Sequence, residues 1–422
     1  MSTPKPYSVP RKSYTLEEGK SDVAAGLIVA VMLIPQGLAY SLLSGLPPII
    51  GLYTATIPLL IYALVGSSRH LAVGPVAMVS LILFAGVSQL AEPGSEQFLS
   101  LAITLTLMVG LIQLLMSVFR LGFLVNFIPY GVISGFTSAA AIMIGLSQVS
   151  HLLNISVDKS GSVFHLLVDV SRHLGEANII TLLLGIGSIL LLILLKSTVP
   201  RVPGALIAVI ISTCVVYVFQ LNVLGVSIIG YVPHGLPSVS LPNIAFQDVM
   251  NLLPLAVTIS LISFVESIAI AKYVAQKERY EIKSNQELYS LGLANTIGSM
   301  FMTMPVAGGF SRTAVNYQAG AKTKFAAVIT SVFILLTLLY LTHLFYYMPK
   351  AVLAAVIIVA VYGLIDFNKA KELFMTKPDE GWALLITFFA TLIIGIKEGL
   401  LIGIGFSLLI FLFKIKWLYV KK

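Results

Sequence analysis

The sequence predicts an all-α polytopic membrane protein, and three observations support this fold class. Of the 422 residues, 58% are hydrophobic and 10% are charged, whereas a soluble protein carries roughly a quarter charged residues. Apolar segments of about 17 to 25 residues, the length that crosses a bilayer as a helix, recur along the whole chain. Lysine and arginine are also unequally distributed between the two sides that these segments would separate. The even spread of segments predicts a single membrane domain.

Fourteen transmembrane segments are predicted, seven in each half of the chain. In order, they lie near residues 22–43, 48–66, 71–90, 97–118, 124–148, 177–196, 203–221, 251–273, 286–303, 305–319, 325–347, 351–365, 379–396 and 399–415. The expected organisation is a cytoplasmic N-terminal segment (1–21), a first seven-span repeat (22–221), an extracytoplasmic loop (222–250), a second seven-span repeat (251–417) and a cytoplasmic tail (418–422).

Charge sets the expected orientation in the cell membrane, with both termini cytoplasmic. In this arrangement 21 of the 26 lysines and arginines face the cytoplasm, 4 face outward, and Arg312 alone lies at membrane depth. The asymmetry follows the positive-inside rule and explains the net charge of +8 without a nucleic-acid partner. No cleavable signal peptide is expected, because the first twenty residues are polar. The single cysteine, Cys214, excludes a disulfide framework and a cysteine metal site.

Two stretches of the chain share an order of features. Both "GLYTATIPLLIYALVGSSRHLAVGPVAMVS" (51–80) and "GLANTIGSMFMTMPVAGGFSRTAVN" (292–316) run through a helix, break at an extended stretch with proline and glycine, and resume as a short helix. A segment with a polar residue at its middle precedes each, Gln36 in one case and Glu266 in the other. Because each half has an odd number of spans, the halves must be inverted relative to each other, a common transporter design.

The two breaks, at the third and tenth spans, are expected to form an anion site. Pro75, Pro305 and the pair Gly308–Gly309 disfavour continuous helix, and each resumed half-helix has free N–H groups and a positive dipole end. Ser311 is expected to cap the second half-helix, and Arg312 adds a permanent charge with a fork suited to oxyanions. The alternatives are that the break is only a packing kink and that Arg312 snorkels to an interface.

Glu266 is the second candidate charge at this depth. Ser260, Ser263 and Ser267 lie on its helical face, which predicts a polar stripe that lines a cavity; the alternative is a structural carboxylate bonded to neighbouring hydroxyls. The six histidines (His70, His151, His165, His173, His234 and His343) are interpreted as solvated or interfacial, and the basic stretch 369–377 as a cytoplasmic surface. No metal cluster, nucleophile motif or nucleotide loop is found, so neither an enzyme nor a cofactor is expected.

Several of these stretches resemble the SulP family of anion permeases, the sulfate permeases. The similarity lies in "IPQGLAYSLLSGLPP", "PPIIGLYTATIPLLIYALVGSSR" (47–69), "NQELYSLGLANTIGSMF" (285–301) and "GGFSRTAVNYQAGAKT" (308–323), and it extends over essentially the whole chain. Two features depart from the family pattern. Ile50 stands where an aromatic residue is usual, and this sequence stops at "KIKWLYVKK", where family members generally continue into a STAS domain. The given sequence is therefore expected to cover the membrane domain only, either as a part of a longer chain or as a short natural form. The resemblance implies a core domain (spans 1–4 and 8–11) that moves against a gate domain (spans 5–7 and 12–14).

The resemblance also implies a set of site residues. The anion would lie between the third and tenth spans, where the matching positions are Val76, Ala77, Phe310, Ser311 and Arg312. Gln36 and Tyr40 match first-span residues that face the same cavity, and Glu266 matches an acid linked to cation coupling in some members.

Sulfate is the expected substrate, because the sequence "FSRTAVN" is similar to the same motif in sulfate-type members and Arg312 suits a divalent oxyanion. Bicarbonate, chloride and dicarboxylates stay open. A carboxylate beside a dianion is unfavourable unless it is protonated or paired with a cation, which favours coupling to a proton, with sodium second. The expected partners are therefore the anion, the coupling ion, the lipid bilayer and a second copy of the chain in a homodimer. An anion channel on the same scaffold is the alternative function.

Overall fold

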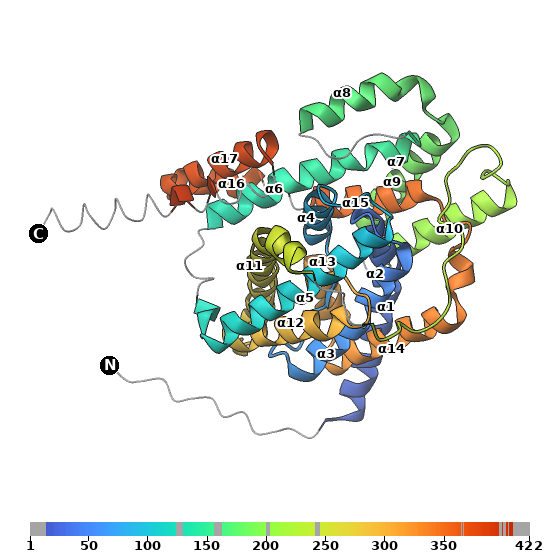
Figure 1. The fold of residues 1–422 in the computed structure, drawn as a ribbon. Helices are drawn as coiled ribbons and strands as arrows, with labels where there is room; N and C mark the ends of the chain where they lie inside the picture. The colour runs from blue at the N-terminus through green and yellow to red at the C-terminus, as the bar shows by residue number, and fades with distance from the viewer. Residues whose placement is uncertain are drawn as a thin grey trace, which may run out of the picture.

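The structure is a computed structural model, and the bundle of helices that it forms is shown in Figure 1. It describes residues 14–123, 130–155, 163–199, 203–240, 245–363, 365, 367–395, 399, 402–403 and 405–407. Most of the predicted last segment, 399–415, lies outside these residues.

The helices of the first half of the chain follow the predicted segments closely. They are α1 (Leu16–Leu43), α2 (Pro48–Thr54), α3 (Ile57–Val65), α4 (Ala77–Val87), α5 (Glu96–Val118), α6 (Tyr130–Ser147), α7 (Val149–Leu153), α8 (Val163–His173), the 3₁₀-helix η2 (Leu174–Glu176), α9 (Ile179–Thr198) and α10 (Gly204–Val218). The additions to the predicted order are α7, α8 and η2, which lie between the predicted spans 124–148 and 177–196.

The second half of the chain is also helical over most of its described residues. Its helices are α11 (Phe246–Lys277), α12 (Ser284–Ser299), α13 (Phe310–Gln318), α14 (Phe325–Tyr340), the 3₁₀-helix η3 (Thr342–Phe345), α15 (Lys350–Tyr362), α16 (Phe367–Thr376) and α17 (Pro378–Ile393). The basic stretch near 369–377, interpreted as surface, forms α16, and the side chains of Lys371 and Lys377 at its end are exposed.

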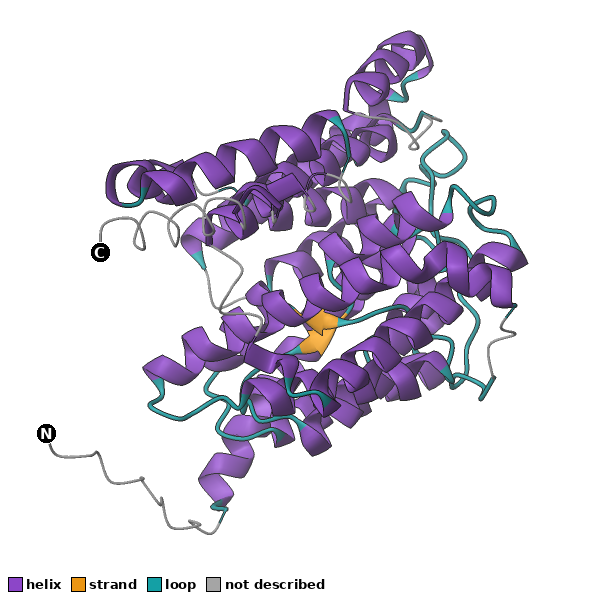
Figure 2. Ribbon diagram, turned by 60° about the vertical axis from the view of Figure 1, so that its left-hand side comes forward, coloured by secondary structure: helices purple, strands orange, loops and turns teal. Residues whose placement is uncertain are grey.

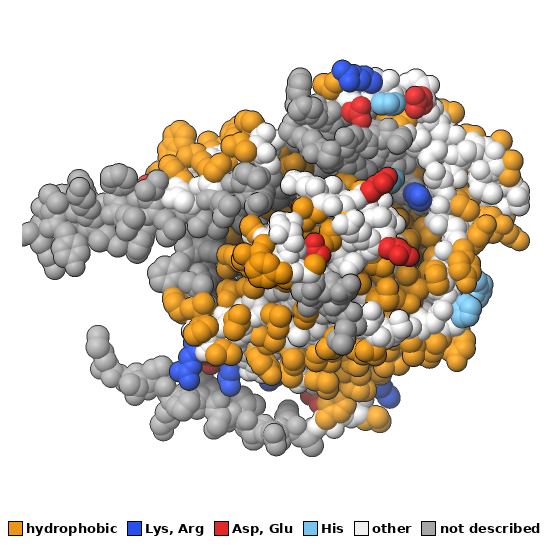
Figure 3. Space-filling view, viewed as in Figure 1, with side chains coloured by type: hydrophobic (Ala, Val, Ile, Leu, Met, Phe, Trp, Pro, Cys, Tyr) orange, Lys and Arg blue, Asp and Glu red, His pale blue; other side chains and the backbone are white. Residues whose placement is uncertain are grey.

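Six segments in the described residues are long and apolar enough to cross a membrane. They are Leu16–Leu43, Pro48–Val65, Glu96–Val118, Gly131–Leu153, Ile179–Thr198 and Phe246–Lys277. Shorter apolar helices include α4, α10, α14 and α15. Figure 3 shows hydrophobic side chains over much of one face, with charged side chains few and scattered. Such a surface is stable only where lipid or protein covers it, as in an integral membrane protein.

Both predicted breaks in the helices are present, and the extended residues at the breaks pair with each other. Strand β1 (Val73–Gly74) and strand β2 (Ala307–Gly308) are antiparallel, with Val73 opposite Gly308 and Gly74 opposite Ala307. The pair lies in the middle of the helices (Figure 2). A short helix follows each strand, α4 after β1 and α13 after β2. Because the strands run in opposite directions, these half-helices leave the pair in opposite directions and begin beside each other.

The helices pack into two groups. In one group α1, α2, α3, α5, α11, α12 and α14 contact one another around the strand pair, and in the other α6, α7, α9, α10, α15 and α17 do so. Close contacts within the first group depend on small residues. For example, α5 and α12 approach so closely at Gly110 that a Cβ there would lie 2.4 Å from Oγ1 of Thr296.

Candidate functional site

The candidate site is the point where the two half-helices begin. The N-cap residues are Val76 for α4 and Gly309 for α13, and neither side chain caps its helix. The first N–H groups of each helix therefore lack partners within the helix, and both helices direct a positive dipole end to this point. The capping role predicted for Ser311 is wrong, because the N-cap of α13 is Gly309, two residues earlier.

Arg312 occupies the second position after the start of α13 and is almost completely buried, with 1% of its surface exposed. Its Nη1 donates to the backbone O of Pro75 at 2.8 Å and lies 3.5 Å from Oε1 of Gln36. The guanidinium therefore reaches across from the tenth-span break to the third-span break. This position excludes the snorkelling alternative, in which the charged group would reach solvent.

Two donors of Arg312 are left over. Among the described residues neither Nε nor Nη2 has a hydrogen-bond partner, although both atoms are buried. Buried donors without a partner are rare and costly in proteins, more so when the group is charged. These two N–H groups lie on one side of the planar fork, the arrangement that binds an oxyanion through two parallel bonds.

Glycine provides the space for this fork. The nearest atoms to a Cβ built on Gly309 would be Cζ, Nη2 and Nε of Arg312, at 2.5, 2.6 and 2.8 Å. A Cβ on Gly74, in β1, would lie 3.5 Å from Nη2. The backbone of Gly309 is thus in direct contact with the guanidinium. This contact, rather than a need for a flexible backbone, explains why the second residue of "GGFSR" is glycine.

Glu266 is near the same centre but does not pair with Arg312. One carboxylate oxygen, Oε2, is buried and has no hydrogen-bond partner among the described residues. Nη1 of Arg312 bonds Pro75 and Gln36, and its other two nitrogens lack a partner among the described residues, so no hydrogen bond there joins Glu266 to Arg312.

The other predicted site residues divide into a buried and an exposed set. Gln36, Tyr40, Val76 and Ala77 are buried, with exposed fractions of 2, 5, 5 and 7%. Phe310 is 53% exposed and its ring lies 6.3 Å from that of Tyr273, and Ser311 is exposed as well. Gln36 contacts Arg312 directly, whereas among the described residues no hydrogen bond links Tyr40 or Ser311 to it.

The serine stripe on α11 does not line a cavity, which corrects the sequence prediction. Ser260, Ser263 and Ser267 are completely buried. Ser260 donates to the backbone O of Val109 in α5, and Oγ of Ser267 accepts from the backbone N of Gly308. Hydroxyls at helical spacing indicate a polar face, but the sequence cannot tell a water-filled space from a neighbouring helix.

His70 is also misread from the sequence, because it is buried rather than solvated. Its Nε2 lies 3.0 Å from the backbone O of Ala321 and its Nδ1 lies 3.2 Å from the hydroxyl of Tyr280. Since a carbonyl only accepts, Nε2 carries the proton and Tyr280 donates to Nδ1. Burial raises the pKa of Tyr280 and lowers that of His70, so both stay neutral in this network at the edge of the third-span break.

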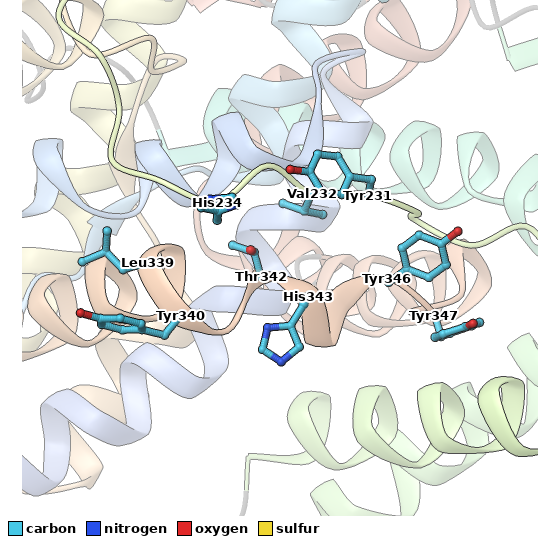
Figure 4. A pocket seen from close by; sticks show the side chains of 9 residues that line it. All are labelled: Tyr231, Val232, His234, Leu339, Tyr340, Thr342, His343, Tyr346 and Tyr347. Atoms are coloured by element: carbon cyan, nitrogen blue, oxygen red, sulfur yellow. The ribbon is translucent and has the colours of Figure 1, made fainter.

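One pocket lies between residues 231–234 and residues 339–347, and none of the predicted site residues lines it. This pocket of about 410 Å³ is lined by Tyr231, Val232, His234, Leu339, Tyr340, Thr342, His343, Tyr346 and Tyr347, as Figure 4 shows. None of these residues is Lys or Arg, and no described half-helix begins there. The pocket offers an anion no fixed positive charge, so the site at Arg312 is the better candidate.

Sequence reasoning missed three polar residues near the strands. Thr313 accepts from the backbone N of Ala72, Asn295 accepts from the backbone N of Val306, and Gln113 bonds to Asn295. A glutamine in the apolar run "LIQLLM" is a visible signal, because polar groups at membrane depth are costly without partners.

Comparisons with known proteins identify the family. The model of the sulfate permease family matches residues 20–390. The chloroplastic sulfate transporter 4.1 of Arabidopsis thaliana is 39% identical over 397 residues, which are 92% of this chain and 58% of the relative. The chain thus spans little more than half the length of that relative. It belongs to the sulfate permease family, as its motifs predict, and this relative is by name a transporter rather than an enzyme.

Two solved structures share the fold. The murine Solute Carrier 26 family member A9 anion transporter, in the inward-facing state, matches with a TM-score of 0.89 at 24% identity. The match covers 96% of this chain and 70% of the murine chain. The transmembrane domain of a cyanobacterium bicarbonate transporter, BicA, has a TM-score of 0.80 at 23% identity, with coverages of 93% and 98%. A helical polytopic membrane fold is thereby confirmed.

Proposed function

We propose that this sulfate permease is a secondary transporter for sulfate, with the anion held between the N-termini of α4 and α13. One observation carries the proposal: the buried guanidinium of Arg312 has two N–H groups without a partner among the described residues. A tetrahedral oxyanion would accept both and would also face two positive dipole ends. The name of the Arabidopsis relative, a sulfate transporter, supports this choice of anion.

Transport would proceed by alternating access, in which a core moves against a gate. The two groups of packed helices support this division, because the half-helices start within the first group. The antiparallel pairing of β1 with β2 supports an inverted relation between the repeats 22–221 and 251–417, since a two-fold axis would exchange the strands. The full arrangement of fourteen spans remains a prediction, as does a homodimer.

Glu266 would couple anion uptake to protons. Its carboxylate oxygen Oε2 has no hydrogen-bond partner in the described residues, and a dianion bound at Arg312 would add a like charge nearby. Protonation of Glu266 removes that repulsion, so proton binding and anion binding would each favour the other. Sodium is the second candidate, because a bound cation would neutralise the carboxylate in the same way.

We also propose which membrane holds the protein and how the protein is oriented in it. We place the protein in the cell membrane with both termini in the cytoplasm, because that orientation puts most lysines and arginines on the cytoplasmic side. Residues 1–21 and 418–422 would then be cytoplasmic, and 222–250 would form an outer loop.

The test is transport by purified protein in proteoliposomes. Sulfate, bicarbonate, chloride and a dicarboxylate are compared at two external pH values, with and without a sodium gradient. Saturable sulfate uptake that shows counterflow and increases at the lower external pH is expected. Large unitary currents would instead indicate a channel, and uptake of another anion in preference to sulfate would replace the proposed substrate.

A further inference from the structure

We propose that Gln113, on α5, is a positioning residue for the anion site, through a network that holds strand β2. The inference rests on the proposed function for its transport readout only. Gln113 is completely buried, and its side-chain amide is bonded at both ends. It has no contact with the place proposed for the anion.

One arm of the network leads from Gln113 to Val306, the residue before β2. Oε1 of Gln113 accepts from Nδ2 of Asn295 at 2.9 Å, and Oδ1 of Asn295 accepts from the backbone N of Val306 at 2.9 Å. A backbone N–H can only donate, so it fixes the orientation of the Asn295 amide. That orientation in turn leaves Oε1 of Gln113 as the acceptor.

The other arm leads to Gly308, the last residue of β2. Nε2 of Gln113 donates to Oγ of Ser263 at 2.8 Å. Ser267 donates to the backbone O of Ser263, and Oγ of Ser267 accepts from the backbone N of Gly308 at 2.7 Å. Every donor in this arm has an acceptor, and the direction of each bond agrees with the orientation set by Asn295.

The two arms therefore hold alternate N–H groups of one extended segment. Alternate residues of a strand direct their N–H groups to the same side, so Val306 and Gly308 both face the network. The next residue, Gly309, donates to the backbone O of Ala72 beside β1. Gly309 also touches the Arg312 guanidinium. A shift of β2 would thus move Gly309, whose backbone limits where the Arg312 guanidinium can lie.

Loss of the Gln113 side-chain amide is expected to weaken sulfate binding, and not only the packing of the helices. Without the Gln113 amide, Asn295 and Ser263 each lose a partner in a dry interior. Strand β2 keeps its pairing with β1 but is held less firmly on its other side. We expect weaker sulfate binding, because the Arg312 donors no longer meet the anion at a fixed distance. The maximal rate per protein molecule should change much less.

The experiment compares Gln113→Met with the parent protein and with Gln148→Met. Methionine keeps the length of the side chain and removes its hydrogen bonds to Asn295, Ser263 and the backbone O of Ser260. Gln148 is a matched control, because it is a buried glutamine that donates to a serine hydroxyl, Ser147, but belongs to the other group of helices. Gln113→Glu is the conservative variant, since a protonated glutamic acid keeps one acceptor and one donor.

Hydrogen–deuterium exchange is the first readout and needs no substrate. Gln113→Met should speed exchange in peptides that cover 305–310 and leave other peptides of α11 and α12 unchanged, whereas Gln148→Met should not affect 305–310. The second readout is the KM for radiolabelled sulfate in proteoliposomes. It should rise by about fivefold or more in Gln113→Met, and recover in Gln113→Glu as the pH is lowered.

Parental exchange at 305–310, or faster exchange across α5, α11 and α12 alike with an unchanged KM, would overturn the proposal. If Gln113→Met yields no folded protein, the pH-dependent KM of Gln113→Glu relative to the parent decides the question instead. A parent that carries no sulfate would refute the proposed function, whereas the exchange result would still test the role of Gln113.

Discussion

Replacement of Gly309 by alanine tests the geometry of the anion site most sharply, because the added group meets the Arg312 guanidinium directly. The new Cβ would lie 2.5 Å from Cζ, whereas ordinary contacts are 3.4 to 4 Å. The fork must therefore move by about 1 Å or more. Such a shift exceeds what the 2.8 Å bond from Nη1 to the Pro75 carbonyl can tolerate.

The expected loss is that of about one hydrogen bond made by a charged group, roughly 1.5–3 kcal/mol. This corresponds to a sulfate affinity about ten- to hundredfold weaker. Gly74→Ala is the graded control, because its Cβ would make an ordinary contact of 3.5 Å with Nη2. Gly187→Ala, on α9 with no atom within 4 Å of the added group, is the neutral control.

The assay is direct sulfate binding to purified protein, measured by scintillation proximity, with thermal melting as a check on folding. The order of affinity should be parent and Gly187→Ala first, Gly74→Ala next and Gly309→Ala last. A folded Gly309→Ala protein that binds sulfate like the parent would show that Arg312 does not set the affinity.

Four further substitutions, at three residues, follow from the same site. Arg312→Ala should reduce sulfate uptake sharply with near-normal expression, and Arg312→Lys should restore uptake only in part because the planar fork is lost; parental uptake in both variants would move the site elsewhere. Ala77→Leu should block binding, because its side chain fills the space beside the start of α4, and unchanged sulfate affinity would contradict this. Glu266→Gln should keep sulfate exchange but lose accumulation driven by a pH step in vesicles, and retained accumulation would make Glu266 a structural residue.

The sequence predicts the breaks in the helices because proline and glycine act locally. Pro75 and the pair Gly308–Gly309 disfavour helix whatever surrounds them, and both breaks are present in the structure. The burial of Arg312 follows from its position in an apolar chain. The N-cap of α13 was placed two residues too late, at Ser311 instead of Gly309, because both residue types can precede a first turn.

The polar network behind β2 could not be predicted in the same way. Gln113 and Asn295 are 182 positions apart in the chain, and Gln113 and Ser263 are 150 apart. Nothing local indicates which helices meet, so the serines of α11 were assigned to a cavity when they in fact contact α5 and β2. The burial of His70 was missed for the same reason, since its partner Tyr280 belongs to another loop.

The central claim is that the anion lies between the two half-helix ends against Arg312. An experimental structure of the full chain with bound selenate, a heavier analogue of sulfate, tests it most directly. The account predicts density for selenate within hydrogen-bond distance of Nε and Nη2 of Arg312, beside the first N–H groups of α4 and α13. Selenate bound elsewhere, with this place empty at saturating concentration, would contradict it.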